Sequence, residues 1–214
     1  MQEPFNEKIA SDILDLLNIS HVNYDLKRTE SNIPFSECKC MVNRDIEFMN
    51  AWWVLKQETQ GKKDLHAHFV NTCNNHNVND AKEHIDEMIL LDFLIGNEDR
   101  HRGNFGILRN PETLEWLGIA PLFDHGNSLF YGEEDDDLQY FGIDSLGKAF
   151  GDSNRQNLQL IDCPKWYSGE KERQIIEIIA QGLSTNERLS QKRIEKILEV
   201  IKERVDILGK LVFH

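Results

Sequence analysis

Apolar residues recur every three or four positions in several stretches of the chain, which is the spacing of one face of an α-helix. Polar segments separate these stretches, and some begin next to a residue that can cap a helix, such as Asn79, Asp80 or Ser190. The predicted helices are 5–17, 46–56, 62–75, 81–95, 154–161, 169–183 and a long last one after Ser190. The pair Trp52-Trp53, within the second of these, is predicted to lie in the core.

Short, partly apolar runs predict strands in two parts of the chain. The first pair is 21–26 and 35–42, separated by polar residues and a proline. The second is a hairpin of 105–108 and 114–122, with its turn at Asn110-Pro111-Glu112-Thr113. Because helices outnumber strands, the predicted fold class is α+β and mostly α.

Polar residues gather where the predicted helix 81–95 ends. The loop Asp99-Arg100-His101-Arg102-Gly103-Asn104 follows it, and one hairpin later the chain reads Asp124-His125-Gly126. Phosphoryl transfer needs such groups, because one carboxylate orients the attacking hydroxyl and oxygen ligands hold Mg²⁺ on the phosphates. Protein kinases place an Asp, an Asn five positions later and an Asp-x-Gly in this order. The pattern therefore indicates a phosphoryl-transfer site.

The stretches DFLIGNEDRHRGNFGIL and APLFDHGNSL resemble the HipA-like kinases, bacterial serine/threonine kinases whose best-known members are toxins of toxin–antitoxin pairs. The resemblance implies a protein-kinase-like large lobe with a truncated small lobe. It implies that Asp99 is the catalytic base, that His101 is a catalytic-loop residue that braces the loop, and that Asn104 and Asp124 bind Mg²⁺ and, through it, ATP. It also implies that Glu7, in an Asn-Glu pair, contacts a strand lysine that holds the nucleotide phosphates.

By the same resemblance, residues 1–44 are a remnant of the small lobe up to the hinge, and 45–214 are the helical large lobe. A Gly-rich loop over the phosphates and a strand lysine are missing, since only Gly61 and Gly96 precede Asp99. The predicted function is therefore that of a HipA-like ATP-dependent Ser/Thr kinase lobe, as a toxin–antitoxin component that is weak or inactive alone. Its expected partners are a protein substrate or a chain that supplies the missing lobe.

Two alternatives remain open. The first is a pseudokinase-like interaction or regulatory module that binds a partner protein without transferring phosphate. The second is a metal-dependent phosphodiesterase that uses Asp99, His101, Asp124 and His125. The hairpin spacing between the two acids favours the kinase over the phosphodiesterase.

Composition and charge narrow the class of protein further. A chain of 214 residues with 40% hydrophobic residues, eleven Phe and four Trp is typical of a globular protein. A net charge of −13 argues against a general surface for nucleic acid or anionic membranes. The start lacks a secretion signal and no long apolar run exists, so we predict a cytoplasmic protein. Its four cysteines, Cys38, Cys40, Cys73 and Cys163, are then predicted to be free thiols.

Acidic residues near the predicted site raise two further expectations. Asp92 lies inside the apolar run before the loop, and because a buried acid needs a partner, it is predicted to brace the loop through an Arg or His. The five acids of 133–137 lie where kinases carry the activation segment. They are predicted to form a solvated loop, with binding of a basic substrate or partner as the minor alternative.

Overall fold

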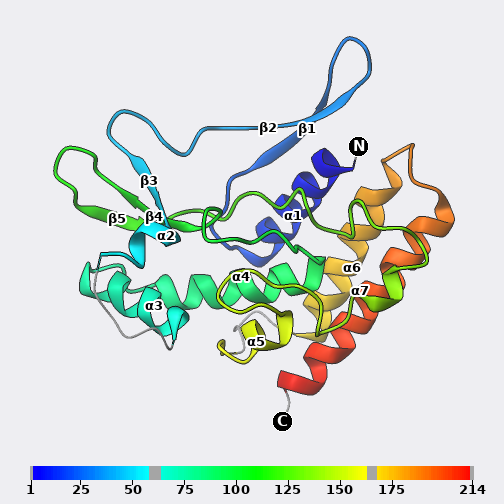
Figure 1. Cartoon of the computed structure of the whole chain (residues 1–214). Coiled ribbons are helices and arrows are strands. Elements are labelled where there is room, and N and C mark those ends of the chain that lie inside the picture. Colours follow the sequence, from blue (N-terminus) through cyan, green and yellow to red (C-terminus); the bar gives the residue numbers. More distant parts are fainter. Residues whose placement is uncertain (1, 58–63, 163–167, 213–214) are drawn as a thin grey trace.

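The computed structural model describes residues 2–57, 64–162 and 168–212 (Figure 1). Cys163 and the first two residues of the predicted helix 62–75 lie outside this part of the chain. The helices are α1 (Glu3–Leu17), α2 (Ala51–Val54), α3 (Leu65–Asn75), α4 (Ala81–Ile95), α5 (Asn154–Leu158), α6 (Gly169–Ser184) and α7 (Gln191–Val212), with a 3₁₀ turn η1 (Leu138–Tyr140). The described residues are thus mainly helical, as the sequence predicts.

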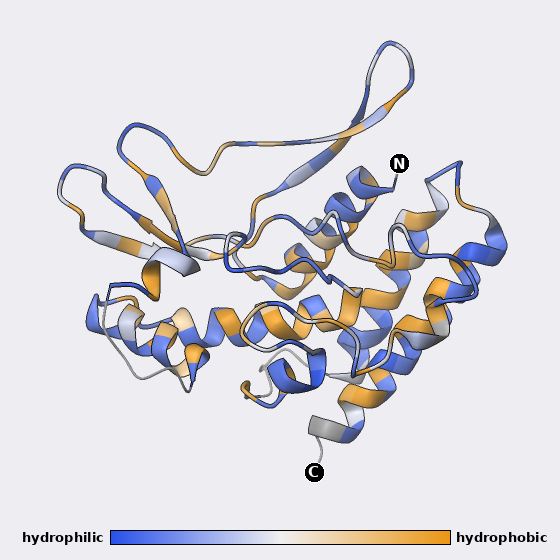
Figure 2. Cartoon of the chain, in the orientation of Figure 1, coloured by the Kyte–Doolittle hydropathy of each residue, from blue (hydrophilic) through white to orange (hydrophobic). Residues whose placement is uncertain are grey.

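The long helices pack around one hydrophobic core. α1 lies against α6, α6 against α7, and α4 against α7. Their buried side chains include Ile13, Leu91, Phe93, Ile179 and Ile201. Figure 2 shows hydrophobic residues along α4, α6 and α7, whereas the tips of the β-hairpins are more hydrophilic. No helix in the described part of the chain is long and apolar enough to cross a membrane.

Two small antiparallel sheets lie on one side of the helices (Figure 1). β1 (Tyr24–Arg28) and β2 (Pro34–Cys38) form a hairpin beside α1. β4 (Gly106–Arg109) pairs with β3 (Glu47–Asn50) on one edge and with β5 (Trp116–Ile119) on the other. The chain after β5 returns to the end of α1, where the N–H of Val22 donates to the Leu122 carbonyl at 2.8 Å.

The helix predicted over 46–56 is wrong. Residues Glu47–Asn50 form β3, and only Ala51–Val54 is helical, because the Asn50 side chain accepts the Trp53 N–H at 3.2 Å and starts a new helix there. This short helix turns only Ala51 and Val54 inward. Trp52 and Trp53 are 50% and 54% exposed, so their predicted place in the core is also wrong.

Other predicted elements agree with the structure to within a few residues. α4 has the predicted bounds, and Gly96 ends it at a φ of +66°, a left-handed conformation that glycine adopts without strain. The Asp80 side chain makes no capping hydrogen bond, contrary to one of the two proposed caps. The hairpin of β4 and β5 lies where it was expected. The division of the chain at residue 44 into two lobes stays a prediction.

The predicted cap of the last helix is confirmed, because Ser190 Oγ accepts the Arg193 N–H at 3.1 Å. Ser190→Ala is expected to lower the free energy of unfolding by about 1 kcal/mol, since it removes this acceptor. Urea denaturation measures the change. Ser190→Asp keeps an acceptor and should retain most of the stability, so an equal loss in both variants would contradict the capping role.

Candidate active site

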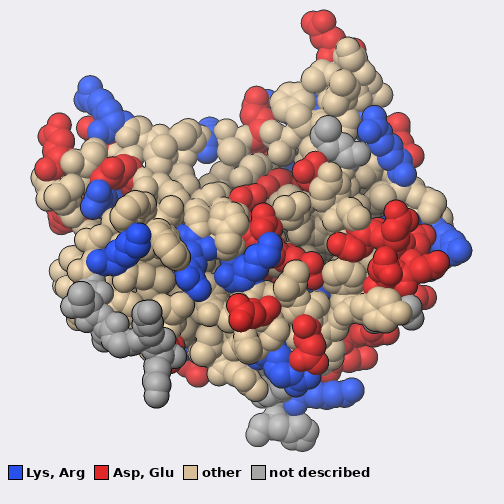
Figure 3. Space-filling view, in the orientation of Figure 1, with Lys and Arg blue, Asp and Glu red and all other residues tan. Residues whose placement is uncertain are grey.

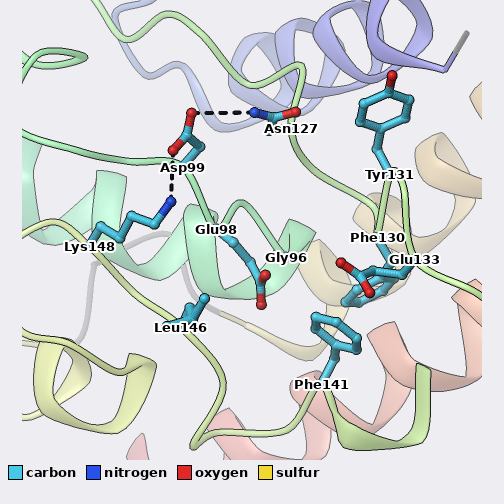
Figure 4. Close-up of a pocket in the computed structure, with 10 residues that line it drawn as sticks. All are labelled: Gly96, Glu98, Asp99, Asn127, Phe130, Tyr131, Glu133, Phe141, Leu146 and Lys148. Atoms are coloured by element: carbon cyan, nitrogen blue, oxygen red, sulfur yellow. Dashed lines mark hydrogen bonds and ion pairs between the residues drawn. The ribbon is translucent and has the colours of Figure 1, made fainter. Parts of the chain in front are cut away.

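The loop between α4 and β4 holds Asp99 at the mouth of a cavity of about 200 Å³ (Figure 4). The Asp99 side chain is 37% exposed, so its carboxylate is open to an incoming group. It accepts a hydrogen bond from Lys148 Nζ at 2.9 Å and one from Asn127 Nδ2 at 3.3 Å. Partial burial raises the pKa of Asp99, but the hydrogen bond and charge of Lys148 outweigh it, and the net pKa is below its ordinary value. Asp99 is therefore ionised at neutral pH.

Lys148→Met is expected to raise the pKa of Asp99, because it removes the cation that favours the carboxylate while partial burial remains. The pH dependence of the ¹³C resonance of the Asp99 carboxyl measures this change. Lys171→Met, on α6, is the matched control and should leave that titration where it is. An unchanged midpoint in Lys148→Met would contradict the ion pair.

Arg100 connects the loop of Asp99 to the segment just before Asp124. Its side chain is buried, and its Nε and Nη2 donate to the two carboxylate oxygens of Asp92 at 2.8 and 3.1 Å. Its Nη1 donates to the Asn104 carbonyl at 2.9 Å and to the Phe123 carbonyl at 2.5 Å. Asp92 also accepts from Asn97 Nδ2 at 2.8 Å, so its predicted role as a brace of the loop is confirmed.

α1 holds the second predicted loop. The Glu7 carboxylate accepts the backbone N–H groups of His125 and Gly126, each at 3.0 Å. Asn6 Nδ2 donates to the carbonyls of Gly126 at 2.8 Å and Ser128 at 2.7 Å. Burial and the charge of Asp124 raise the pKa of Glu7 to about 7, although both N–H groups lower it. Both carboxylate oxygens of Glu7 are thus used to shape the loop that carries Asp124.

Asn104 and Asp124 offer oxygen ligands of the kind that Mg²⁺ prefers. Asn104 Nδ2 donates to the Asp99 carbonyl at 3.2 Å, which fixes the amide and leaves its oxygen for a ligand. Asp124 is exposed, and among the described residues no cation forms an ion pair with it. The described residues contain no group of three His, Cys, Asp or Glu that could hold a metal. Because both offer oxygen atoms, Asn104 and Asp124 suit Mg²⁺, which takes few protein ligands and is commonly bound by substrate phosphates as well.

The two histidines of the site differ in burial. His101 is exposed, and its Nδ1 accepts the Gly103 N–H at 3.0 Å, which is a contact within the loop. His125 is 1% exposed, and burial lowers its pKa well below the ordinary value. His125 is therefore neutral, and its side chain is buried beneath the backbone of the loop to which it and Asp124 belong. The functional roles assigned to Asp99, His101, Asn104, Asp124 and Glu7 from the sequence stay predictions.

Sequence reasoning missed Lys148 and Asn127 as partners of Asp99. Lys148 lies 49 positions away from Asp99, in an irregular segment after η1. No periodicity or spacing points to such a contact. Asn127 follows the Asp124-His125-Gly126 string directly, and this position was the only signal available for it.

Known proteins resemble this chain in part of its sequence and in its fold. No family model matches the chain. Over 50 residues the sequence is 48% identical to the serine/threonine-protein kinase CtkA of Helicobacter pylori (strain J99). That match covers 23% of this chain and only 15% of the length of the relative.

Two solved structures share the fold. A crystal structure of a Helicobacter pylori proinflammatory kinase CtkA superposes with a TM-score of 0.69 at 20% identity, over 100% of this chain and 81% of that one. A chain of the toxin–antitoxin complex of HipA, HipB and operator DNA from Shewanella oneidensis MR-1 superposes with a TM-score of 0.52 at 14% identity, over 97% of this chain and 55% of that one. The chain has the kinase-like fold of these proteins, which confirms its predicted resemblance to the HipA-like serine/threonine kinases.

Proposed function

We propose that this chain is the catalytic lobe of an ATP-dependent protein kinase that phosphorylates serine or threonine. The observation that carries the proposal is the arrangement around Arg100. One buried guanidinium binds the Asn104 carbonyl and the Phe123 carbonyl, so the loop of Asp99 and Asn104 and the segment that leads into Asp124 share one support. A base and two oxygen ligands on rigid supports are the parts that phosphoryl transfer needs.

In the proposed reaction Asp99 accepts a hydrogen bond from the serine or threonine hydroxyl and takes its proton. The hydroxyl oxygen forms a bond to the γ-phosphorus of ATP, and the bond from that phosphorus to the β–γ bridging oxygen breaks, so that ADP leaves. Mg²⁺, held by Asn104 and Asp124, would neutralise charge on the phosphates. Lys148 keeps Asp99 ionised before the substrate binds.

A partner chain, or residues outside this sequence, would cover the phosphates. The residues before Asp99 include no Gly-rich loop. Within the described part of the chain, β1 and β2 pair only with each other, so each leaves one edge on which a further strand could add. We propose that a strand of the partner pairs at one of these edges. This chain would then be a component of a cytoplasmic toxin–antitoxin pair. The lack of a Gly-rich loop among the residues before Asp99 also favours a second candidate. This is a pseudokinase-like module that binds a partner without phosphate transfer.

Calorimetry with ATP and MgCl₂ tests the proposed site. The wild-type chain is expected to bind, and Asp124→Ala to bind at least about tenfold more weakly, a loss of about 1.4 kcal/mol for one metal ligand. Glu187→Ala removes an exposed carboxylate after α6 and serves as the control, which should bind like the wild type. Equal binding by both variants would contradict the assigned metal site. No binding by the wild type would exclude independent kinase activity and leave the interaction module.

A further inference from the structure

The cavity beside Asp99 has chemistry that the proposed transfer does not use. Two more carboxylates, those of Glu98 and Glu133, line it together with the rings of Phe130 and Phe141. Figure 4 shows the side chains of Glu98 and Glu133 entering the cavity from two different segments, one before Asp99 and one after Tyr131. The cavity is therefore acidic and partly walled by aromatic rings.

The Glu98 carboxylate lacks a partner although part of it is buried. Its Oε1 has no hydrogen bond from any of the described residues. Burial raises the pKa of Glu98, and the negative charge of Glu133 raises it further. A buried acceptor without a donor costs about 1–3 kcal/mol. Because Oε1 itself is closed to solvent, a ligand in the cavity reaches it only when the Glu98 side chain turns, and a donor on that ligand would then recover this free energy.

The buried cation that acts most strongly on Glu98, Arg204, does not supply that donor. The guanidinium of Arg204 donates to the carbonyls of Phe93 and Phe141 and to Ser145 Oγ. Its charge lowers the pKa of Glu98 without reversing the net rise. Lys148, the other cation at the cavity, is paired with Asp99. Among the described residues, the charges of Arg204 and Lys148 both lower the pKa of Glu98, but neither cation donates a hydrogen bond to it. Three carboxylates line the cavity, those of Glu98, Asp99 and Glu133.

One wall of the cavity suits a flat cation, namely the partly buried ring of Phe141. The buried ring of Phe130 already carries the guanidinium of Arg204, which lies 5.2 Å from the ring centroid. The rings of Phe130 and Phe141 lie with their centroids 5.3 Å apart and tilted by 57°. Aromatic rings attract cations placed over their faces, and a planar guanidinium can stack on a ring while it donates two hydrogen bonds to a carboxylate. At about 200 Å³ the cavity is smaller than pockets for drug-sized molecules, which are about 300–1,000 Å³.

We propose that this cavity is a specificity subsite that binds a basic side chain of the protein substrate, with arginine preferred over lysine. The inference rests on the proposed kinase function, because Glu98 is the sequence neighbour of Asp99 and the bound residue would lie close to the phosphoacceptor. The acidic residues 134–137, which follow Glu133, enlarge the region of negative charge. Figure 3 shows acidic side chains gathered on this face beside α7, where Arg193 and Lys196 hold Asp135 and Asp136. Such a field would steer a basic segment toward the cavity.

Peptide binding tests the subsite without requiring phosphate transfer. The probe is a fluorescein-labelled alanine peptide with one central serine and arginine at two positions on each side, measured by fluorescence anisotropy at physiological ionic strength. The matched peptides carry citrulline, a neutral isostere of arginine, or lysine at these positions. The wild-type chain should bind the arginine peptide about tenfold more tightly than the citrulline peptide, with the lysine peptide between them.

Two single variants and one control locate the binding. Glu98→Gln and Glu133→Gln should each remove most of the preference for arginine over citrulline. The control Glu112→Gln/Glu115→Gln lowers the net negative charge in the exposed turn between β4 and β5, and should keep the preference. An equal loss in the control would show that arginine binds only through the overall charge of −13, and would overturn the subsite.

The outcomes separate this inference from the kinase proposal. Equal affinity for arginine and citrulline peptides overturns the subsite even if the chain transfers phosphate. A preference for arginine that depends on Glu98 and Glu133 supports the subsite even if the isolated chain binds no ATP. Binding of ATP is measured separately on Asp124→Ala, which leaves both carboxylates of the subsite in place.

Discussion

Arg100→Met is expected to lower the free energy of unfolding by about 3–5 kcal/mol, because it leaves the Asp92 carboxylate buried without its cation. The side chains of Asp92 and Arg100 are only 7% and 2% exposed, so water cannot replace the lost partner. The substitution also removes the donor from the carbonyl of Asn104, which is buried, and from that of Phe123, which is partly buried. Urea denaturation followed by circular dichroism measures the change.

Two comparisons show whether the buried pair is the cause. Arg109→Met breaks an ion pair with Glu47 whose side chains are 26% and 39% exposed, and it should cost no more than about 1 kcal/mol. The double variant Asp92→Leu/Arg100→Met removes both buried charges and should recover part of the stability lost in Arg100→Met. If Arg100→Met and Arg109→Met proved equally stable, Arg100 would not be the support of the loop.

The same residue links stability to the proposed chemistry. Arg100 belongs to the loop of Asp99, yet one of its nitrogens reaches the residue just before Asp124. Asp92 anchors it on α4, inside the core of the chain. The predicted base and the two predicted metal ligands therefore depend on one buried ion pair, and loss of this pair is expected to disturb all three together.

Much of this support could be predicted from the sequence. α4 is apolar at helical spacing and ends at a glycine, so its bounds were predictable, and so was the need of Asp92 for a partner. The position of the Asp99-to-Asn104 loop and of the hairpin after it followed from turn residues. These features are local, and hydrophobic periodicity predicts local structure well.

The rest depends on contacts between distant segments or on short elements. The run before Trp52 has apolar residues that suit a strand as well as a helix, and its pairing with β4, about 60 positions later, decides for the strand. Lys148 reaches Asp99 across 49 positions, and Glu98 and Glu133 meet only through the packing of the segment after Tyr131. The spacing of residues within one helix or strand does not predict contacts between segments that are far apart in the sequence. The charged groups around Asp99 could therefore be identified only from the structure.

Glu7 is expected to make stability fall as the pH rises from about 4.5 to about 7. Its pKa is about 7 in the folded chain against an ordinary 4.5, so in this window the unfolded chain releases the proton while the folded chain keeps it. Below 4.5 both states hold the proton and Glu7 carries no penalty. Above 7 both states are ionised, and the penalty reaches its full value of about 3 kcal/mol, from about 1.4 kcal/mol for each unit of pKa.

Glu7→Gln isolates this effect, because its side chain has no charge to titrate. Other carboxyls also shape the pH profile, so the measured quantity is the difference in unfolding free energy between the wild type and Glu7→Gln at each pH. This difference should shift against the wild type by about 3 kcal/mol between pH 4.5 and 7 and stay level above that range. The ¹⁵N resonances of the His125 and Gly126 amides, which donate to Glu7, should titrate with a midpoint near 7. Parallel pH profiles for the two proteins would show that Glu7 holds the loop of Asp124 with an ordinary carboxylate, and that the folded chain does not resist its ionisation.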